Sequence, residues 1–577
     1  MGYLVIDNFG DGLDGRRTLL TTKAGALLTC KNAHITRGKE IEKRKAFVSQ
    51  YTLPSNTFGL HAAGGLLYIF GSRNLASQVP SGLTYQRLQH PAGPTIEMTD
   101  IVFTESFNGL PYVIATYDNG DTLHFFNGTI ITSWDTISGA VANIAAIASA
   151  LASQIDAVAA FSSTANGSVV TITGPVNTAF TLSLSAVNGG ANNDQAMAQT
   201  TTQAATASLP QITLVTLSGT FEANDRYSIA ISAPSISFNQ QFSISASSSG
   251  VARTVKTFGQ KMYGATKSLL YFTEVADPTK WGGTQNGAGF INLLNQDSGA
   301  ENLTALAVYQ GRLAVFSERT IQIWSMDPDP TKNIQVQTLN NIGTFAPRSV
   351  VAFGDVDVFF LSESGVRSLR ARDSSNAATV SDIGTSIDTI IQRELENFEE
   401  AQKRRAVGII EPSDGRYWLA LGSKIFVFSF FTGSSVAAWS TYELDFSISA
   451  LTYLNNRVFA RSGDTIYIYG GASGNEYDDC EVVIELPFLD GGKPAHTKSI
   501  QAIDMASEGV WDVYIGVDHT APNYRDFVGT YDGATYALGR MLCFAVGSHM
   551  SFKLVNKAAG AARLGNFAIH FELGQPE

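Results

Sequence analysis

Short runs of alternating apolar and polar residues recur along much of the chain. The clearest copy is Leu303 to Trp324, in which large apolar residues fall mostly at every second position on both sides of Gln310-Gly311. Alternation of this kind places apolar side chains on one face of a strand. The central dipeptide tolerates the positive φ that a hairpin requires. The pattern therefore predicts antiparallel hairpins, and related copies begin at Ser349 and Ile448, with looser ones at His61 to Ser72, Asn108 to Gly128, Lys256 to Trp281 and Arg405 to Trp439.

The copies return at a period of roughly 40 to 50 residues, which is typical of a β-propeller, a ring of small sheets. A β-sandwich built from the same hairpins is the alternative. Even strand spacing and a recurring aromatic residue at the end of each unit favour the propeller. The expected fold class is mainly β, with a β-propeller, an inserted small α+β module and a C-terminal β-sandwich-like domain.

One segment interrupts the repeat. From about Thr136 to Gly250 the composition shifts to Ala, Ser, Thr, Asn and Gly, and aromatic residues nearly vanish. Apolar residues at steps of three and four predict an amphipathic helix over Ile137 to Val158. A flexible connection over Gln195 to Ala207 is an alternative for part of the segment. Strands are predicted at Ser168 to Ile172, Phe180 to Leu184, Gln211 to Leu217 and Tyr227 to Ser232.

A second amphipathic helix is predicted inside the repeat region, over Ser381 to Arg405. Its apolar stripe is expected to pack on a blade edge, and docking of a neighbouring subunit is the alternative role. The stripe consists of Ile383, Ile387, Ile390, Ile391, Leu395 and Phe398.

Beyond Gly471 the predicted strands lengthen, which indicates a terminal β-sandwich. These strands are Cys480 to Leu486, Ser499 to Met505, Trp511 to Val517 and Asn566 to Leu573. The expected division of the chain is 1–135 for the first part of the propeller, 136–250 for the inserted module, 251–475 for the rest of the propeller and 476–577 for the C-terminal β domain.

Charge argues against a protein that binds nucleic acid tightly. The formal net charge of the 577 residues is −12, whereas tight phosphate binding needs a basic face. Basic clusters at Arg37 to Lys45 and Lys403 to Arg405 adjoin glutamates, so they are interpreted as solvated faces or subunit contacts. Only 16% of the residues are charged, and such a neutral surface suits a permanent assembly.

Cysteine usage and hydropathy predict a protein made in a reducing compartment. Cys30, Cys480 and Cys543 are widely spaced and form no CxxC pair. The first residues lack the pattern of a signal peptide, and no apolar stretch approaches the roughly 20 residues that span a bilayer. We therefore expect cytoplasmic synthesis and no membrane anchor.

Motifs for chemistry are absent from the sequence. It contains no GxSxG, GxxxxGK[ST] or HExxH motif. The cluster Gly282, Gly283, Gly287 and Gly289 lacks a phosphate-binding lysine and is interpreted as a loop. Asp7, Asp11 and Asp14 lack the ligand spacing of a calcium loop. We expect no enzyme and propose no catalytic, cofactor-binding or metal-binding residue.

The single box Ser413 to Trp418 differs in spacing from the repeated boxes of propeller sialidases, and a hairpin turn accounts for it. A propeller that binds or cleaves host glycan is the alternative function. In that case Tyr417, Trp418 and Trp439 would stack on sugars, although their positions beside predicted strands favour a place in the core.

Several motifs together resemble the tail nozzle, or tail tubular protein B, family of short-tailed bacteriophages. The opening contains Gly12 to Asp14, Asn32 and Gly38 to Arg44 in the family's order. The stretch AVYQGRLAVFSERTIQIW, followed by FLSESGVRSL, the predicted helix after Ser381 and DGRYWLAL, continues the likeness. The resemblance covers about two thirds of the chain and leaves out 136–250 and the C-terminal domain.

The resemblance implies a structural virion protein without enzymatic activity. Subunits would form a ring, expected to be a hexamer, below the head-to-tail adaptor of the viral tail. The expected partners are further copies of the chain, the adaptor and a tail fibre or tail-tip protein. Genome DNA would pass through the lumen without specific binding. The net charge of −12, independently of the resemblance, motivates the hypothesis that acidic residues face the lumen and let DNA slide.

Overall fold

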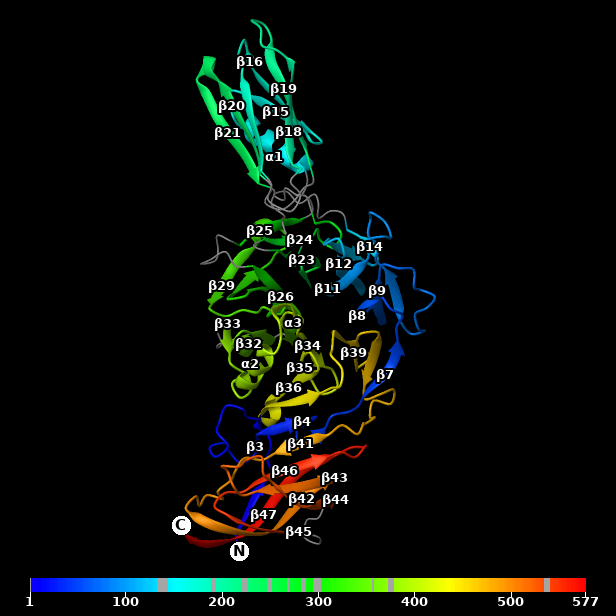
Figure 1. The fold of residues 1–577 in the computed structure, drawn as a ribbon, viewed down its shortest axis with the longest axis vertical. Coiled ribbons are helices and arrows are strands. Elements are labelled where there is room, and N and C mark those ends of the chain that lie inside the picture. Colours follow the sequence, from blue (N-terminus) through cyan, green and yellow to red (C-terminus); the bar gives the residue numbers. More distant parts are fainter. Residues whose placement is uncertain are drawn as a thin grey trace. The chain divides into compact units, whose positions relative to one another are not determined.

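The computed structural model describes residues 2–131, 144–187, 194–219, 226–245, 252–266, 269–281, 287–293, 302–354, 357–371, 378–533 and 540–576. The fold is mainly β (Figure 1). The chain divides into two compact units, one formed by 1–130, 253–268 and 292–577 and the other by 131–252 and 269–291. No helix in the described ranges has the length and hydropathy needed to cross a bilayer.

Small sheets of consecutive strands dominate the first unit. Consecutive strands within them pair antiparallel except for β9 and β10, and β37 also pairs in parallel with β2 (Gly12–Leu13) and β4 (Thr29–Lys31). The turns have the predicted chemistry, since Gln310 and Gly311 both adopt positive φ between β26 and β27. The strands are β8 (Phe58–Ala63), β9 (Leu66–Gly71), β10 (Thr84–Arg87), β11 (Met98–Phe107), β12 (Leu110–Tyr117), β13 (Thr122–Phe126), β14 (Thr129–Ile130), β22 (Thr254–Phe258), β23 (Lys261–Ala265), β26 (Leu303–Tyr309), β27 (Arg312–Ser317), β28 (Thr320–Ser325), β29 (Ile334–Asn340), β30 (Val351–Phe353), β31 (Asp357–Ser362), β32 (Gly365–Ala371), β33 (Ala378–Ser381), β34 (Val407–Glu411), β35 (Arg416–Leu421), β36 (Lys424–Phe431), β37 (Val436–Glu443), β38 (Ala450–Leu454), β39 (Arg457–Ser462) and β40 (Thr465–Tyr469).

The first strands of these sheets neighbour one another in a closed cycle. In the described part of the unit the order is β8, β11, β22, β26, β30, β34, β38 and back to β8, seven strands in all. The last sheet contains a strand from much earlier in the chain, because β7 (Phe47–Thr52) pairs with β40 and places Thr52 opposite Thr465. Buried apolar residues such as Phe316 and Phe360 fill the space between successive sheets. The cycle of first strands is called the strand ring below.

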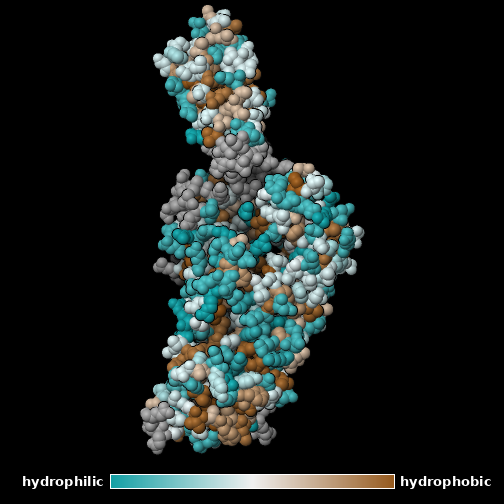
Figure 2. Space-filling view, in the orientation of Figure 1, coloured by the Kyte–Doolittle hydropathy of each residue, from teal (hydrophilic) through white to brown (hydrophobic). Residues whose placement is uncertain are grey.

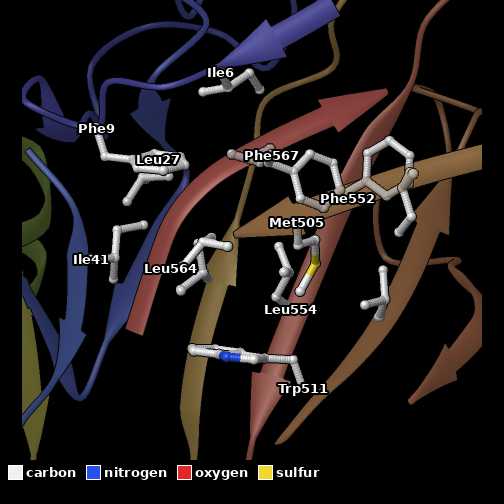
Figure 3. Packing of buried hydrophobic residues seen from close by; sticks show 14 of the residues in the cluster. Ile6, Phe9, Leu27, Ile41, Met505, Trp511, Phe552, Leu554, Leu564 and Phe567 are labelled. Atoms are coloured by element: carbon white, nitrogen blue, oxygen red, sulfur yellow. The ribbon is translucent and has the colours of Figure 1, made fainter. Parts of the chain in front are cut away.

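Two further sheets enclose a core built from both ends of the chain (Figure 3). The core joins Ile6, Phe9 and Leu27 to Trp511 and Phe567. One sheet has the order β45-β42-β47-β6-β5, with β1 on β47, and the other continues from β37 as β4-β41-β46-β43-β44. The strands are β1 (Gly2–Ile6), β2 (Gly12–Leu13), β3 (Ala26–Leu27), β4 (Thr29–Lys31), β5 (Ala33–Ile35), β6 (Ile41–Lys43), β41 (Val482–Glu485), β42 (His496–Glu508), β43 (Val510–Gly516), β44 (Asp526–Asp532), β45 (Met541–Gly547), β46 (Ser551–Asn556) and β47 (Arg563–Pro576).

The strand β45 lies at the edge of its sheet and carries apolar side chains into solvent. Leu542, Phe544 and Val546 alternate along it and are 63%, 80% and 63% exposed. Figure 2 shows hydrophobic surface over these C-terminal strands, at the bottom of the view.

The second unit packs one helix against two sheets. Ile147, Leu151 and Ile155 of α1 (Ile144–Asp156) are fully buried among strand residues, as the predicted helical stripe requires. Residues 137–143 of the predicted helix lie outside the described residues. The sheet orders are β15-β16-β19-β18 and β17-β20-β21. Their strands are β15 (Ser162–Asn166), β16 (Val169–Val176), β17 (Thr181–Val187), β18 (Ala196–Gln203), β19 (Pro210–Ser218), β20 (Arg226–Ala233) and β21 (Phe238–Ser245), and the unit also contains β24 (Leu269–Phe272) and most of β25 (Gly289–Asn292).

One alternative and one expectation are not supported. The flexible connection, the alternative for part of Gln195 to Ala207, gives way to a regular strand, since β18 pairs along β19. The helix predicted over Ser381 to Arg405 is two helices, α2 (Asp388–Glu396) and α3 (Glu400–Lys403). The break follows from a new N-terminal cap, in which the Glu399 side chain and Gln402 form a capping box. The apolar stripe on α2 packs into the core, where Ile391 is fully buried.

Candidate functional site

A cavity of about 460 Å³ lies at the strand ring, between β8, β11, β34 and β38. Three arginines from distant parts of the sequence line it: Arg348 before β30, Arg405 before β34 and Arg461 on β39. Threonine and serine side chains supply most of the other polar lining, including Thr57, Thr99, Thr104 and Ser449. The cavity is therefore a partly open site with mixed polar and apolar lining, formed by several sheets of one unit.

Arg461 is the structural member of the three arginines. Its side chain is buried, and the guanidinium donates hydrogen bonds from Nε to the Gly463 carbonyl at 2.9 Å and from Nη1 to the Gly59 carbonyl at 2.7 Å. Nη2 also donates to the carbonyl and hydroxyl oxygens of Thr57. Burial lowers the pKa of Arg461 to about 10. These bonds connect the last sheet to the loop before β8.

Arg348 and Arg405 contact residues that lie on, or just before, other first strands of the ring. Nη1 of Arg348 donates to the Ser449 carbonyl at 3.2 Å, and its Nη2 donates to the Arg405 carbonyl at 3.4 Å. Nη2 of Arg405 in turn donates to Asp100 Oδ2 on β11 at 2.8 Å. Desolvation lowers the pKa of Arg348. Together with Arg461, these side chains link strands around the cavity.

The charges at the cavity do not cancel. The lining contains the three arginines against two carboxylates, Asp100 and Asp464. Asp100 pairs with Arg405, and Asp464 Oδ1 lies 3.9 Å from Arg461 Nη2. Within the described ranges, no carboxylate oxygen lies within 4.0 Å of the Arg348 nitrogens. The cavity therefore has one more positive charge than negative charge.

Two residues of the predicted basic cluster Arg37 to Lys45 are buried inside the molecule, whereas Arg37 is exposed. Lys43 is buried, and its Nζ donates to the Ala558 carbonyl at 2.7 Å and to Asn556 Oδ1 at 3.2 Å. Arg44 is also buried and pairs with Asp478 at 2.9 Å. The interpretation of these two residues as solvated or intersubunit groups is wrong, because both connect the N-terminal segment to the C-terminal strands.

The second basic cluster is paired with acidic groups. Lys403 contacts Glu400 at 2.6 Å, and Arg404 contacts Glu318 at 2.7 Å. Arg405 of this cluster reaches the cavity. The sequence pattern marked Arg405 as charged, but it contained no signal that would group Arg405 with Arg348 and Arg461, because only ring closure brings the three together.

The remaining candidates occupy structural positions. The Ser413 to Trp418 box spans the turn between β34 and β35, where Glu411 accepts a hydrogen bond from the Ser413 backbone at 2.8 Å. Tyr417, Trp418 and Trp439 are each only 1% exposed, as expected for core residues. Asp14 accepts the Arg16 backbone N–H at 3.0 Å in a turn. Gly282 and Gly283 lie outside the described residues, whereas Gly287 and Gly289 lie at the start of β25.

The three cysteines all lie in the described ranges and form no disulfide with one another. Cys30, Cys480 and Cys543 are free thiols, and burial raises the pKa of all three. No group of three or more His, Cys, Asp or Glu side chains in the described ranges is placed to hold a metal ion.

Comparisons with known proteins found distant structural likenesses. No protein-family model and no curated protein matches the chain. The extracellular domain of a putative hybrid two-component system from B. thetaiotaomicron aligns at 11% identity over 98% of this chain and 67% of that one, with a TM-score of 0.22. The extracellular domain of a putative one-component system from the same organism aligns at 10% identity over 72% and 56%, with a TM-score of 0.12. Both TM-scores are far below 0.5, so neither likeness assigns a fold or a function to this chain.

Proposed function

We propose that the first unit is a seven-bladed β-propeller. The cyclic order of its seven first strands supports this architecture, because each blade of a propeller contributes its innermost strand to a central ring. The pairing of β7 with β40 supports it further, since a strand from early in the chain completes the last sheet. The 131–252 segment is then an inserted α+β module, and the two sheets around Trp511 form a sandwich.

The function proposed for the chain is that of a structural tail protein of a short-tailed bacteriophage. It forms the distal nozzle of the tail, below the head-to-tail adaptor, and resides in the virion after synthesis in the host cytoplasm. The sequence resemblance described above motivates the family. The observation that carries the proposal is the closed strand ring, because a ring in which every sheet is braced on two sides resists deformation.

A nozzle must contain and release DNA, which is a mechanical task. Identical subunits close a ring through heterologous interfaces, and the ring forms a conduit. The net charge of −12 supports a conduit that DNA leaves easily, because strong phosphate contacts would slow its exit. Further copies, the adaptor and a tail fibre or tail-tip protein are the proposed partners.

Negative-stain imaging combined with mass photometry tests this proposal. The purified chain is measured alone and with a candidate adaptor protein. Six copies of 61.7 kDa give rings of about 370 kDa, which is the expected result in at least the adaptor-containing sample. A monomer in both samples contradicts the nozzle.

The alternative of a glycan-binding propeller relied on Tyr417, Trp418 and Trp439 stacking on sugars. These three side chains are buried, so they cannot contact a glycan at the surface. Binding to a glycan array by a chain that stays monomeric would nevertheless revive that alternative.

A further inference from the structure

We infer that the arginine-lined cavity of the strand ring binds a small molecule through a carboxylate or phosphate group. This inference goes beyond the nozzle function and is independent of ring assembly by subunits. It rests on the arrangement of Arg348, Arg405 and Arg461 around a cavity of about 460 Å³.

Among the described residues, no carboxylate of the cavity pairs directly with the positive charge of Arg348. Arg348 contacts two backbone carbonyls and no carboxylate oxygen within 4.0 Å in the described ranges. The side chain is partly exposed, and the attraction of Asp100 is opposed by the repulsion of Arg405, so the charge of Arg348 is only partly compensated. An anion beside Arg348 would supply the missing counter-charge.

Several N–H donors of Arg348 and Arg405 are not used in the hydrogen bonds described above. A guanidinium carries five N–H groups in a planar fork. The hydrogen bonds of Arg348 account for one N–H on each of Nη1 and Nη2, and Arg405 donates one bond to Asp100. The remaining N–H groups match the paired oxygens of a carboxylate or phosphate, which guanidinium groups bind in bidentate fashion. Arg461 contributes charge from the wall, because most of its donors bond to Thr57, Gly59 and Gly463.

The size and rigidity of the site also matter for binding. A cavity of about 460 Å³ lies within the range of small-molecule sites, roughly 300 to 1,000 Å³. Thr104 lines it, whereas the hydroxyls of Thr57 and Ser449 already donate to the carbonyls of Pro54 and Arg461. Because the carbonyls of Ser449, Arg405 and Gly59 hold the side chains of Arg348 and Arg461, these two arginines need little reorganisation to bind.

Calorimetric titration of the full chain at low ionic strength tests the inference. Inorganic phosphate and glucuronate are the two anionic probes, and glucose is the neutral control. Saturable binding of at least one anion with a dissociation constant of about 1 mM or tighter is expected, without binding of glucose. Stronger phosphate binding identifies a phosphate-bearing ligand, and stronger glucuronate binding identifies an acidic sugar. Absence of saturation by both anions overturns the inference.

Variants separate the site from general electrostatic attraction. Arg348→Gln is expected to weaken binding about tenfold. Arg404→Gln removes the same charge from a neighbouring exposed residue that pairs with Glu318, and binding should stay within about twofold of the original. Equal weakening by both substitutions contradicts a specific site.

A gain-of-binding variant keeps the test decisive if Arg348→Gln does not fold. Asp100→Asn removes the carboxylate that competes for Arg405, so about threefold tighter anion binding is expected. Unchanged or weaker binding by a folded Asp100→Asn protein overturns the inference.

Discussion

Long cationic side chains hold together segments that are far apart in the sequence. Lys43 and Arg44 connect the N-terminal segment to Asn556 and Asp478, and Arg461 connects β39 to β8. Each has a head group that donates to several oxygens. Truncating such a residue therefore leaves buried acceptors unpaired as well as removing a charge.

The buried side chain of His34 is expected to make the stability of the protein depend on pH. The imidazole is 4% exposed, and Nδ1 lies 2.8 Å from the Tyr442 hydroxyl. Burial and the nearby Arg416 lower its pKa to about 4, from an ordinary value near 6.5. Between these values the unfolded chain binds a proton that the folded chain excludes, so stability falls as pH falls. We expect His34 to contribute a loss of about 1 kcal/mol per pH unit between pH 6 and pH 4.5.

Urea unfolding at several pH values measures this slope. His34→Gln cannot titrate, so its stability should fall less steeply than that of the original protein over the same range. Parallel curves for the two proteins would show that His34 does not contribute to the pH dependence.

At the scale of elements, β7 closes the last sheet of the strand ring. Phe47 of β7 packs with ring centroids 5.1 Å from Tyr469 and 6.2 Å from Trp418. Phe47→Ala removes these contacts, and a loss of about 2 to 3 kcal/mol in the free energy of unfolding is expected.

Tyr453→Ala is the matched control for Phe47→Ala, because Tyr453 lies in the same sheet on β38 and is 56% exposed. Its effect should stay within about 0.5 kcal/mol. Chemical denaturation compares the two variants, and equal losses would mean that β7 adds no special support.

The elements that sequence predicted best are the hairpins, because alternation and turn residues are local signals. The β26–β27 hairpin at Gln310-Gly311 is confirmed in register and in turn conformation. The strand β18 was harder to predict because its exposed Thr and Gln residues derive their order from pairing with β19. The arginine-lined cavity was not predictable from spacing, since Arg348 and Arg461 belong to different repeats and meet only after the ring closes.

At the scale of the whole molecule, each unit has its own core, so each is expected to have its own unfolding transition. Leu151 of α1 is fully buried in the core of the second unit. Leu151→Ala should destabilise that unit by about 3 kcal/mol and leave the other transition in place.

Scanning calorimetry resolves the two transitions. Ser153→Ala, at an exposed position of the same helix, is the control and should shift neither by more than about 0.5 kcal/mol. A common downward shift of both transitions in Leu151→Ala would contradict independent cores.

The pairing of β7 with β40 also determines when the last sheet can form during translation. Thr52 leaves the ribosome long before its partner Thr465 is translated. The interval is longer still between β1 and its partner β47. Neither the last sheet nor the sheet that contains both ends can therefore form until nearly the whole chain has been translated. A nascent or prematurely terminated chain keeps these strand edges unpaired, which makes it a substrate for chaperones and proteases. Chains that escape degradation are thereby selected for having been translated through β47.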